Sequence, residues 1–204
     1  PGTQYIINFG DGQSVTYIHP NVPTSITHTY TFSSCGNTPT GAGNSPNSFV
    51  ASMTTTNPCF PPAFTTVGPI IINEPPTPNF TILNRSCVNT SVNLLNTSNT
   101  GVIVSSSGCN SSSPFYWTIS PSTGWTATGL GSNGGVSNDI DFWENGVMNP
   151  SINFNTPGNY TITLYIGNSC DIRSISKTIC IESPLSPQFT LNSTSGCTPV
   201  AVTA

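Results

Sequence analysis

Residues 156–167 read Thr-Pro-Gly-Asn-Tyr-Thr-Ile-Thr-Leu-Tyr-Ile-Gly, and this stretch decides the fold class. Its first four residues have the composition of a turn. After the turn, apolar side chains recur at every second position, a period that places them on one face of a β-strand. These side chains belong to Tyr160, Ile162, Leu164 and Ile166. The opposite face carries Thr161, Thr163 and Tyr165, so the pattern predicts a half-buried strand.

The same strand pattern recurs elsewhere in the chain. Segment 49–59 resembles segment 160–170, and each ends in a cysteine. Segment 75–82 resembles segment 183–191 in the same way, and the cysteines that follow these two segments also correspond. These matches share one period of about 110 residues, the signature of a tandem array of domains about the size of an immunoglobulin-like sandwich. We therefore expect an all-β chain of tandem immunoglobulin-like β-sandwich repeats.

Two proline-rich stretches, at 75–78 and 184–187, mark the repeat boundaries, because proline gives short and fairly stiff linkers. Residues 1–75 are then the C-terminal part of one repeat, 76–184 a complete repeat, and 185–204 the first strand or two of a third. Alternation and turn residues in the complete repeat predict strands near 79–84, 90–97, 115–120, 151–154, 159–167 and 173–182.

The composition excludes several classes of function. Only 5% of residues are charged, so the surface must be built from Ser, Thr, Asn and Gly. Disorder usually combines low hydrophobicity with high net charge, whereas this chain is 35% hydrophobic with a net charge of −4. Its 3 Lys and Arg residues cannot form a patch for nucleic acid. No apolar run is long enough to enter a membrane, because a span needs about 20 residues.

One pair of motifs resembles a known family. Tyr5–Gly12 (YIINFGDG), followed by His28-Thr29-Tyr30, resembles the signature of PKD domains. The complete repeat keeps the later part of that pattern but has FYWTIS at 115–120 in place of the first motif, so it is similar to a PKD-like or immunoglobulin-like relative. The resemblance implies a sandwich fold and structural roles for Asp11 in a tight turn and for His28. It also implies that Tyr30 anchors a corner through its hydroxyl.

The low charge, the richness in Asn, Ser and Thr and the cysteine-bearing repeats are similar to the giant SprB-type surface adhesins of gliding Bacteroidetes. In that family such repeats form long stalks exported by the type 9 secretion system. The resemblance implies an extracellular, cell-surface location and a role in adhesion linked to gliding motility. The partners it implies are neighbouring repeats, other copies in a filament or bundle, and a surface polysaccharide or solid surface.

Seven cysteines without a CxxC pair favour disulfides over the alternative of a metal site, and disulfides require an oxidising compartment. In an immunoglobulin-like sandwich the B–C and F–G loops lie at one pole, and the A–B turn and the end of strand G at the other. The resemblance therefore implies one bridge at each pole, Cys109–Cys170 and Cys87–Cys180. Cys35, Cys59 and Cys197 fall in the incomplete repeats, and we expect their partners outside the sequence.

The segment 125–150 holds the other candidate sites. Asp139, Asp141 and Glu144 cluster within a few residues, and carboxylates at this density can hold Ca²⁺, although the spacing is not that of an EF-hand. The alternative is a polar loop beside a packed Trp143. Trp125 and Trp143 are also candidates for a carbohydrate-binding surface, whereas Trp117 is expected in the core. No other cofactor is expected.

Two functional interpretations follow. The first is a structural or adhesive repeat segment of a long secreted surface protein, in which the exposed edges of 185–204 invite pairing with another copy. The alternative is a carbohydrate-binding accessory module of a secreted hydrolase, a setting in which PKD domains also occur. Catalysis is not expected, because the two histidines and seven acids lie mostly in turns and form no recognisable triad or carboxylate pair.

Overall fold

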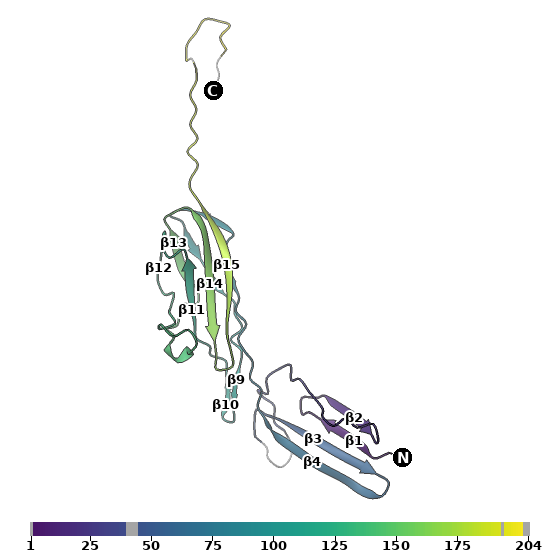
Figure 1. Cartoon of the computed structure of the whole chain (residues 1–204). Helices are drawn as coiled ribbons and strands as arrows, with labels where there is room; N and C mark the ends of the chain where they lie inside the picture. Colours follow the sequence, from purple (N-terminus) through teal and green to yellow (C-terminus); the bar gives the residue numbers. More distant parts are fainter. Residues whose placement is uncertain (1, 40–44, 193, 202–204) are drawn as a thin grey trace.

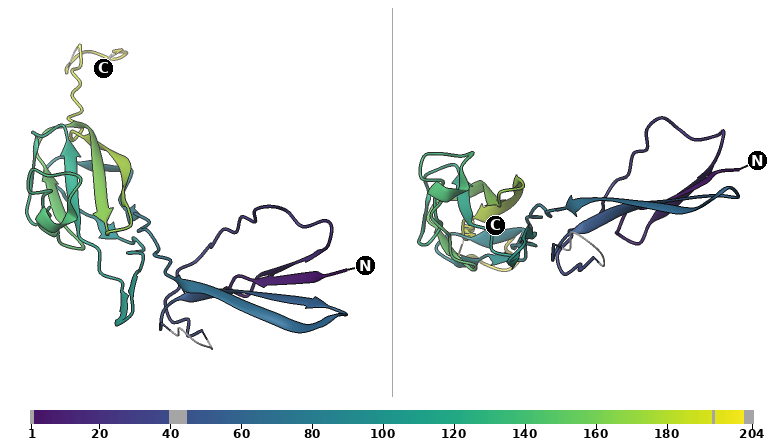
Figure 2. Two further views of the ribbon diagram at one scale, coloured as in Figure 1. Left: turned by 60° about the horizontal axis from the view of Figure 1, so that its bottom comes forward. Right: turned by 90° about the horizontal axis from the view of Figure 1, so that it is seen from below.

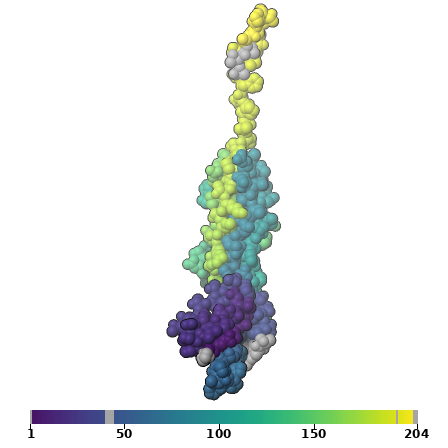
Figure 3. Space-filling model, turned by 90° about the vertical axis from the view of Figure 1, so that its right-hand side faces the viewer, coloured from purple at the N-terminus to yellow at the C-terminus, as the bar shows by residue number. Residues whose placement is uncertain are grey.

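The computed structural model describes residues 2–39, 45–192 and 194–201. Its regular elements in these residues are β-strands and one short 3₁₀ helix, η1 (Ile140–Phe142). The strands form a four-stranded sheet between residues 4 and 70, called the N-terminal sheet, and a two-layered sandwich between residues 80 and 182. Both parts and an extended tail follow one another along the molecule (Figures 1 and 3). The all-β expectation is confirmed.

The N-terminal sheet is antiparallel throughout and has the order β2-β1-β3-β4. Its strands are β1 (Gln4–Asn8), β2 (Ser14–Ile18), β3 (Phe49–Asn57) and β4 (Phe60–Ile70). Successive residues of a strand face opposite sides, so the register defines two faces. The face that we call inner carries Tyr5, Ile7, Ala51, Met53, Thr65 and Val67, and the outer face carries Ile6, Asn8, Ser52, Thr54, Phe64 and Thr66.

Aromatic side chains cover one end of the inner face. The Phe9 ring stacks on His28 with centroids 3.9 Å apart, and Tyr30 stacks on Phe49 at 5.1 Å. Phe49 is buried, with only 1% of its surface exposed. Towards β4 the inner face is open, because Val67 remains 69% exposed. Among the described residues, no second sheet covers this part of the face.

The sandwich contains two layers. One layer has the order β11-β14-β15-β6, and the other has the order β12-β13-β7 and is continued by the pair β5-β8. The strands are β5 (Phe80–Thr81), β6 (Arg85–Cys87), β7 (Ser91–Asn93), β8 (Leu95–Asn96), β11 (Phe115–Ser120), β12 (Trp125–Ala127), β13 (Ser151–Phe154), β14 (Gly158–Gly167) and β15 (Ile172–Glu182). All pairs in the sandwich are antiparallel except β15 with β6.

The core lies between these layers and is formed by the residues that alternation predicted. Ile162 and Leu164 of β14 are completely buried. Trp117 of β11 pairs with Leu164 in the ladder, and its indole N–H donates to the carbonyl of Val147 at 3.1 Å. The ring of Phe80 meets Trp117 edge-on at 5.2 Å and so joins the first short strand of the sandwich to the opposite layer.

A tyrosine at the start of β14 fixes the corner of the sandwich. The Tyr160 hydroxyl lies 2.9 Å from the carbonyl oxygen of Thr156 and 3.2 Å from that of Gly124. Immunoglobulin-like domains have a tyrosine at this place whose hydroxyl donates to the backbone a few residues upstream. Together with the two layers and the antiparallel order of β11, β14 and β15, this corner establishes the immunoglobulin-like fold of the sandwich.

The path of the chain differs between the N-terminal sheet and the sandwich at the point where their sequences also differ. In the N-terminal sheet, the turn Phe9–Gly12 folds β2 back onto β1. In the sandwich, the chain leaves the layer after β11, and β12 pairs with β13 of the other layer. The residues after Ser120 lack the Gly-Asp-Gly turn, which explains the different path. Gly10 has φ of +85°, and a Cβ atom there would lie 2.6 Å from the Val50 carbonyl oxygen, so this turn requires glycine.

The tail from residue 183 onwards contains no strand in its described residues and extends away from the sandwich (Figure 1). Leu185 is 94% exposed and Phe189 is 77% exposed. Phe189 corresponds to Phe80 in the internal repeat, and Phe80 is completely buried. The tail therefore has the sequence of a first strand without the packing of one.

Candidate functional site: the joint between the two β units

The linker between the N-terminal sheet and the sandwich is paired along its length. Glu74 and Val102 exchange backbone hydrogen bonds of 2.8 and 3.0 Å, as two residues of an antiparallel bridge do. Thr77 and Asn99 form a second bridge of the same kind. The proline-rich segment is therefore held against the sandwich by a short ladder.

A hairpin of the sandwich reaches the joint. It consists of β9 (Ile103–Ser105) and β10 (Gly108–Asn110), which pair with each other and project towards the N-terminal sheet (Figures 1 and 2). On β10, Cys109 forms a disulfide with Cys35, which lies in the loop that precedes β3; the two Cα atoms are 5.9 Å apart. The sequence separation of this pair is 74 residues. The bridge joins the two β units covalently at a second place, in addition to the linker.

Hydrogen bonds surround this disulfide. The backbone N–H of Val104 donates to the Asn73 side-chain oxygen at 2.8 Å, and the Asn47 amide donates to the carbonyl of Ser105 at 3.1 Å. Ser34, which precedes the bonded cysteine, is completely buried and exchanges hydrogen bonds with Ile72. The loop, the linker and the hairpin thus form one connected unit.

This structure corrects the expected disulfide pairing. Cys109 cannot pair with Cys170, because the β9–β10 hairpin carries it away from the pole of the sandwich and towards the N-terminal sheet. The disulfide partner of Cys35 lies within the sequence, whereas we expected that partner to lie outside it. The expected Cys109–Cys170 pairing was wrong because it assumed that the B–C loop, which contains Cys109, stays at the pole of the sandwich.

The bridge between Cys87 and Cys180 is also not formed. These cysteines lie on paired strands, but Cys180 is level with Arg85, and Cys87 is level with Glu182. An offset of two residues places their Cα atoms about 8 Å apart, beyond the limit of about 7 Å for a disulfide. Cys59, Cys87, Cys170, Cys180 and Cys197 all have free thiols.

The three acidic residues of 139–144 do not converge on one point. An oxygen of Asp139 accepts from the backbone N–H of Asp141 at 3.1 Å and caps η1. Glu144 instead accepts from the Ser132 hydroxyl at 3.1 Å. Across the described ranges, no group of three His, Cys, Asp or Glu side chains lies close enough to hold a metal ion. The geometry favours the polar loop over a calcium site at these residues.

The two tryptophans of the carbohydrate hypothesis do not form an exposed platform. Trp143 is only 8% exposed, and its indole N–H donates to the carbonyl of Val136 at 3.2 Å. Trp125 is half-buried against the core, and its N–H donates to the carbonyl of Pro121 at 2.7 Å. Burial corrects the assignment of Trp143, since a sugar cannot stack on a covered ring. Trp117 lies in the core as expected, with 2% of its surface exposed.

The FGDG and HTY motifs meet in the structure. An Asp11 carboxylate oxygen lies 2.7 Å from His28 Nε2, and the other accepts from the Gln13 N–H at 3.0 Å. Burial raises the pKa of Asp11, but these hydrogen bonds and the His28 charge outweigh it and hold that pKa below its ordinary value of 3.8. The Tyr30 hydroxyl donates to the carbonyl of Phe9 at 3.0 Å. The structural roles predicted for Asp11, His28 and Tyr30 are confirmed.

No family model and no curated protein sequence matches the chain. Solved structures that are similar to it include the extracellular domains 3–5 of Drosophila OTK, with 15% identity and a TM-score of 0.36 over 68% of this chain and 41% of that one. The amphioxus IgVJ-C2 molecule has 15% identity and a TM-score of 0.34, over 87% of this chain and 88% of that one. Sidekick-1 immunoglobulin domains 1–5 have 12% identity and a TM-score of 0.30, over 69% of this chain and 26% of that one. This chain thus spans less than half the length of the OTK and Sidekick-1 chains.

None of the helical residues described forms a segment long and apolar enough to cross a bilayer.

Proposed function

We propose that this chain is a structural, load-bearing segment of an extracellular surface protein, in which successive β units are held by a braced joint. The observation that carries the proposal is the disulfide between Cys35 and Cys109, which connects the two units beside their linker. A flexible tether would need neither this bond nor the hydrogen-bonded ladder along residues 74–77.

The bridge changes the path of a force applied to the ends of the chain. Tension passes from the N-terminal side to Cys35, crosses the disulfide to Cys109 and continues into β11. Residues 36–108, including the whole linker, are bypassed. A joint of this kind keeps its length under load, because the linker can extend only after the covalent bond is reduced.

Single-molecule stretching of the 204-residue protein tests this role. When it is fully unfolded under oxidising conditions, the chain should be shorter by the 74 residue steps that lead from Cys35 to Cys109. At about 3.3–3.6 Å per residue this is about 240–270 Å, which should be recovered when a reductant is added. Cys59→Ser is the matched control and should behave like the parent chain. Equal extension with and without reductant would overturn the proposal.

Extracellular placement has a separate test. Disulfides persist in oxidising compartments and are rare in the cytosol. Protein taken directly from its source into acid and an alkylating reagent should yield a linked Cys35–Cys109 peptide, while Cys59 is alkylated. Alkylation of both Cys35 and Cys109 would place the protein in a reducing compartment.

The finer assignment that we propose is a region of PKD-like repeats resembling the SprB-type adhesins. The contacts between Asp11 and His28 and between Tyr30 and Phe9 support the PKD-like part, because they explain why these motifs occur together. The open inner face of the N-terminal sheet and the exposed Phe189 support the boundaries at 75 and 185, because apolar side chains lie uncovered on both sides of the packed sandwich. Its partners are then neighbouring repeats and, in a filament, other copies.

A further inference from the structure

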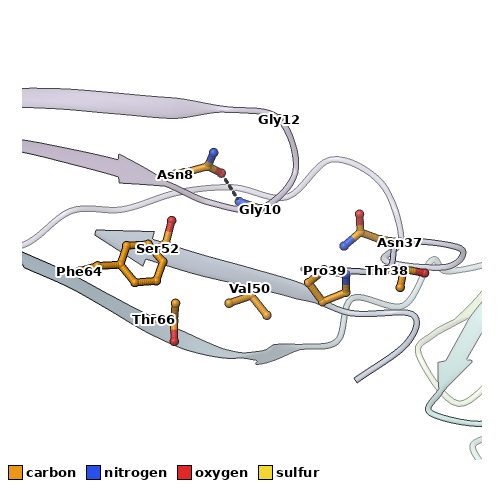
Figure 4. A pocket seen from close by; sticks show the side chains of 10 residues that line it. All are labelled: Asn8, Gly10, Gly12, Asn37, Thr38, Pro39, Val50, Ser52, Phe64 and Thr66. Carbon is orange, nitrogen blue, oxygen red and sulfur yellow. Dashed lines mark hydrogen bonds between the residues drawn. The ribbon is translucent and has the colours of Figure 1, made fainter. Parts of the chain in front are cut away.

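The outer face of the N-terminal sheet contains a polar pocket that the load-bearing role does not use. Its volume is about 380 Å³. Figure 4 shows the turn at Gly10 and Gly12 above the pocket, Phe64 and Ser52 at one end, and the loop residues at the other. It is lined by Asn8, Gly10, Gly12, Asn37, Thr38, Pro39, Val50, Ser52, Phe64 and Thr66.

The strand register makes a polar row of this face. Asn8 of β1 pairs with Ser52 of β3, and Ser52 pairs with Thr66 of β4. Three side chains with hydrogen-bonding groups therefore lie side by side across three strands. With strands about 4.8 Å apart, the row spans about 10 Å.

These groups are available to a ligand. The Asn8 side-chain oxygen accepts from the Gly10 N–H at 2.8 Å, which leaves its NH₂ group as a donor. In the part of the chain that the structure describes, the hydroxyls of Ser52, Thr66 and Thr38 form no hydrogen bond to protein. The pocket thus offers donors and acceptors, each of which can exchange bound water for a ligand hydroxyl.

The next row of the same face has an apolar side chain at each end and a threonine in the middle. Phe64 pairs with Thr54, which pairs with Ile6. Phe64 is 67% exposed, so its ring presents a free surface beside the polar row. An aromatic face carries a partial negative charge and attracts the slightly positive C–H groups of a sugar ring. Hydroxyls and amides beside a free ring form a pattern suited to a polyol with one apolar side.

The charge of the lining residues indicates which ligand charge the pocket favours. None of the ten lining residues is ionisable. The nearest carboxylate, that of Asp11, is engaged by His28 and fully buried. A phosphate, a carboxylated sugar or a cation would find no counter-charge here. The lining therefore favours a neutral ligand.

From these observations we infer that the outer face of the N-terminal sheet is a binding site for a neutral oligosaccharide. One sugar ring lies against Phe64, and the hydroxyls of the ligand bond to Asn8, Ser52 and Thr66. The outer face points away from the inner face, so the site stays accessible when another sheet packs on the inner one. This inference does not depend on the load-bearing joint, and either can fail without the other.

The test uses the ¹⁵N-labelled 204-residue protein and three neutral glucans, cellohexaose, laminarihexaose and maltohexaose, at millimolar concentrations. At least one should shift the backbone amide signals of Ser52, Phe64 and Thr66 in a saturable way. Phe64→Ala should weaken that binding about tenfold or more, as loss of an aromatic stacking partner does, without altering the remaining spectrum. Binding should be insensitive to added salt, because no charge is involved.

Phe60→Ala is the matched control. Phe60 is on the same strand and is 74% exposed, but it does not line the pocket. Its replacement should leave the affinity unchanged. The inference is overturned if none of the three glucans shifts these amides, or if Phe60→Ala and Phe64→Ala weaken binding equally. It is also overturned if the shifts map to the sandwich.

Discussion

Cys35 and Cys109 are bonded to each other although they belong to different β units, and their Cα atoms lie 5.9 Å apart. Within a single sandwich, a disulfide mainly restricts the unfolded chain. Here the bond also fixes the separation of two units that would otherwise be joined by one peptide linker. Its removal should therefore affect the joint more than either β unit.

We predict that replacing both cysteines by serine loosens the joint. Opening of the joint should become easier by about 2–4 kcal/mol, the usual contribution of a native disulfide. Hydrogen exchange at the Val104 amide, which donates to the Asn73 side chain across the joint, should speed up accordingly. The amide of Leu164 in the sandwich core should be unaffected. Unchanged exchange at Val104 would show that the hydrogen bonds alone hold the joint.

Phe80 and Phe189 provide a second prediction, because they occupy equivalent places in the repeat but only Phe80 is buried. Phe80→Ala should lower the free energy of unfolding of the sandwich by about 3–5 kcal/mol, as large core truncations do. Phe189→Ala should change it by less than about 0.5 kcal/mol. Denaturant unfolding followed by tryptophan fluorescence measures both, since all 3 tryptophans lie in the sandwich.

If Phe189→Ala changes the free energy of unfolding by an amount that depends on protein concentration, the change has a different meaning. It would show that the tail packs on another copy, as expected for pairing through exposed strand edges. Size-exclusion chromatography coupled to light scattering would then show association of the parent chain and a monomeric variant.

Much of the sandwich was predictable because its longer strands alternate with a period of two. The strand expected at 115–120 matches β11, and the one at 159–167 matches β14 within one residue. The strand expected at 90–97 is divided into β7 and β8. The β9–β10 hairpin was not predicted, because each of its strands has only 3 residues and carries no clear alternation.

The joint itself was beyond the reach of sequence patterns. The pairing of Cys109 depends on the direction in which the hairpin leaves the sandwich, and no local signal specifies that direction. In the same way, the burial of Trp143 depends on the path of 128–150, which brings its ring edge-on to Tyr116 at 4.8 Å. By contrast, the role of Asp11 could be predicted from the local chemistry of a tight turn. The role of Tyr30 could be predicted from a recurrent motif in which a tyrosine hydroxyl donates to the backbone.

The Asp11 carboxylate predicts a pH dependence. Its pKa in the folded chain lies below 3.8, so its stabilising contribution is complete above that value and is lost as the pH falls through the folded pKa. Asp11→Asn should destabilise the N-terminal sheet at pH 7 by on the order of 1 kcal/mol, because the charged acceptor for His28 is lost. The difference between the two proteins should vanish at acidic pH. Amide exchange of β1 and β3, measured at several pH values, checks this, and a difference that persists below the folded pKa would contradict it.

The Tyr30 hydroxyl provides the last prediction. It donates to the Phe9 carbonyl at 3.0 Å and so holds the loop between β2 and β3 against the end of β1. Tyr30→Phe keeps the stacking on Phe49 but leaves that carbonyl without this donor. The N-terminal sheet should lose about 0.5–1.5 kcal/mol, the usual net value of one hydrogen bond. Tyr17→Phe is the matched control, because in the described chain the Tyr17 hydroxyl forms no hydrogen bond. Exchange of the β1 and β3 amides should be faster in the Tyr30 variant alone, and equal effects of the two substitutions would rule out a specific anchor.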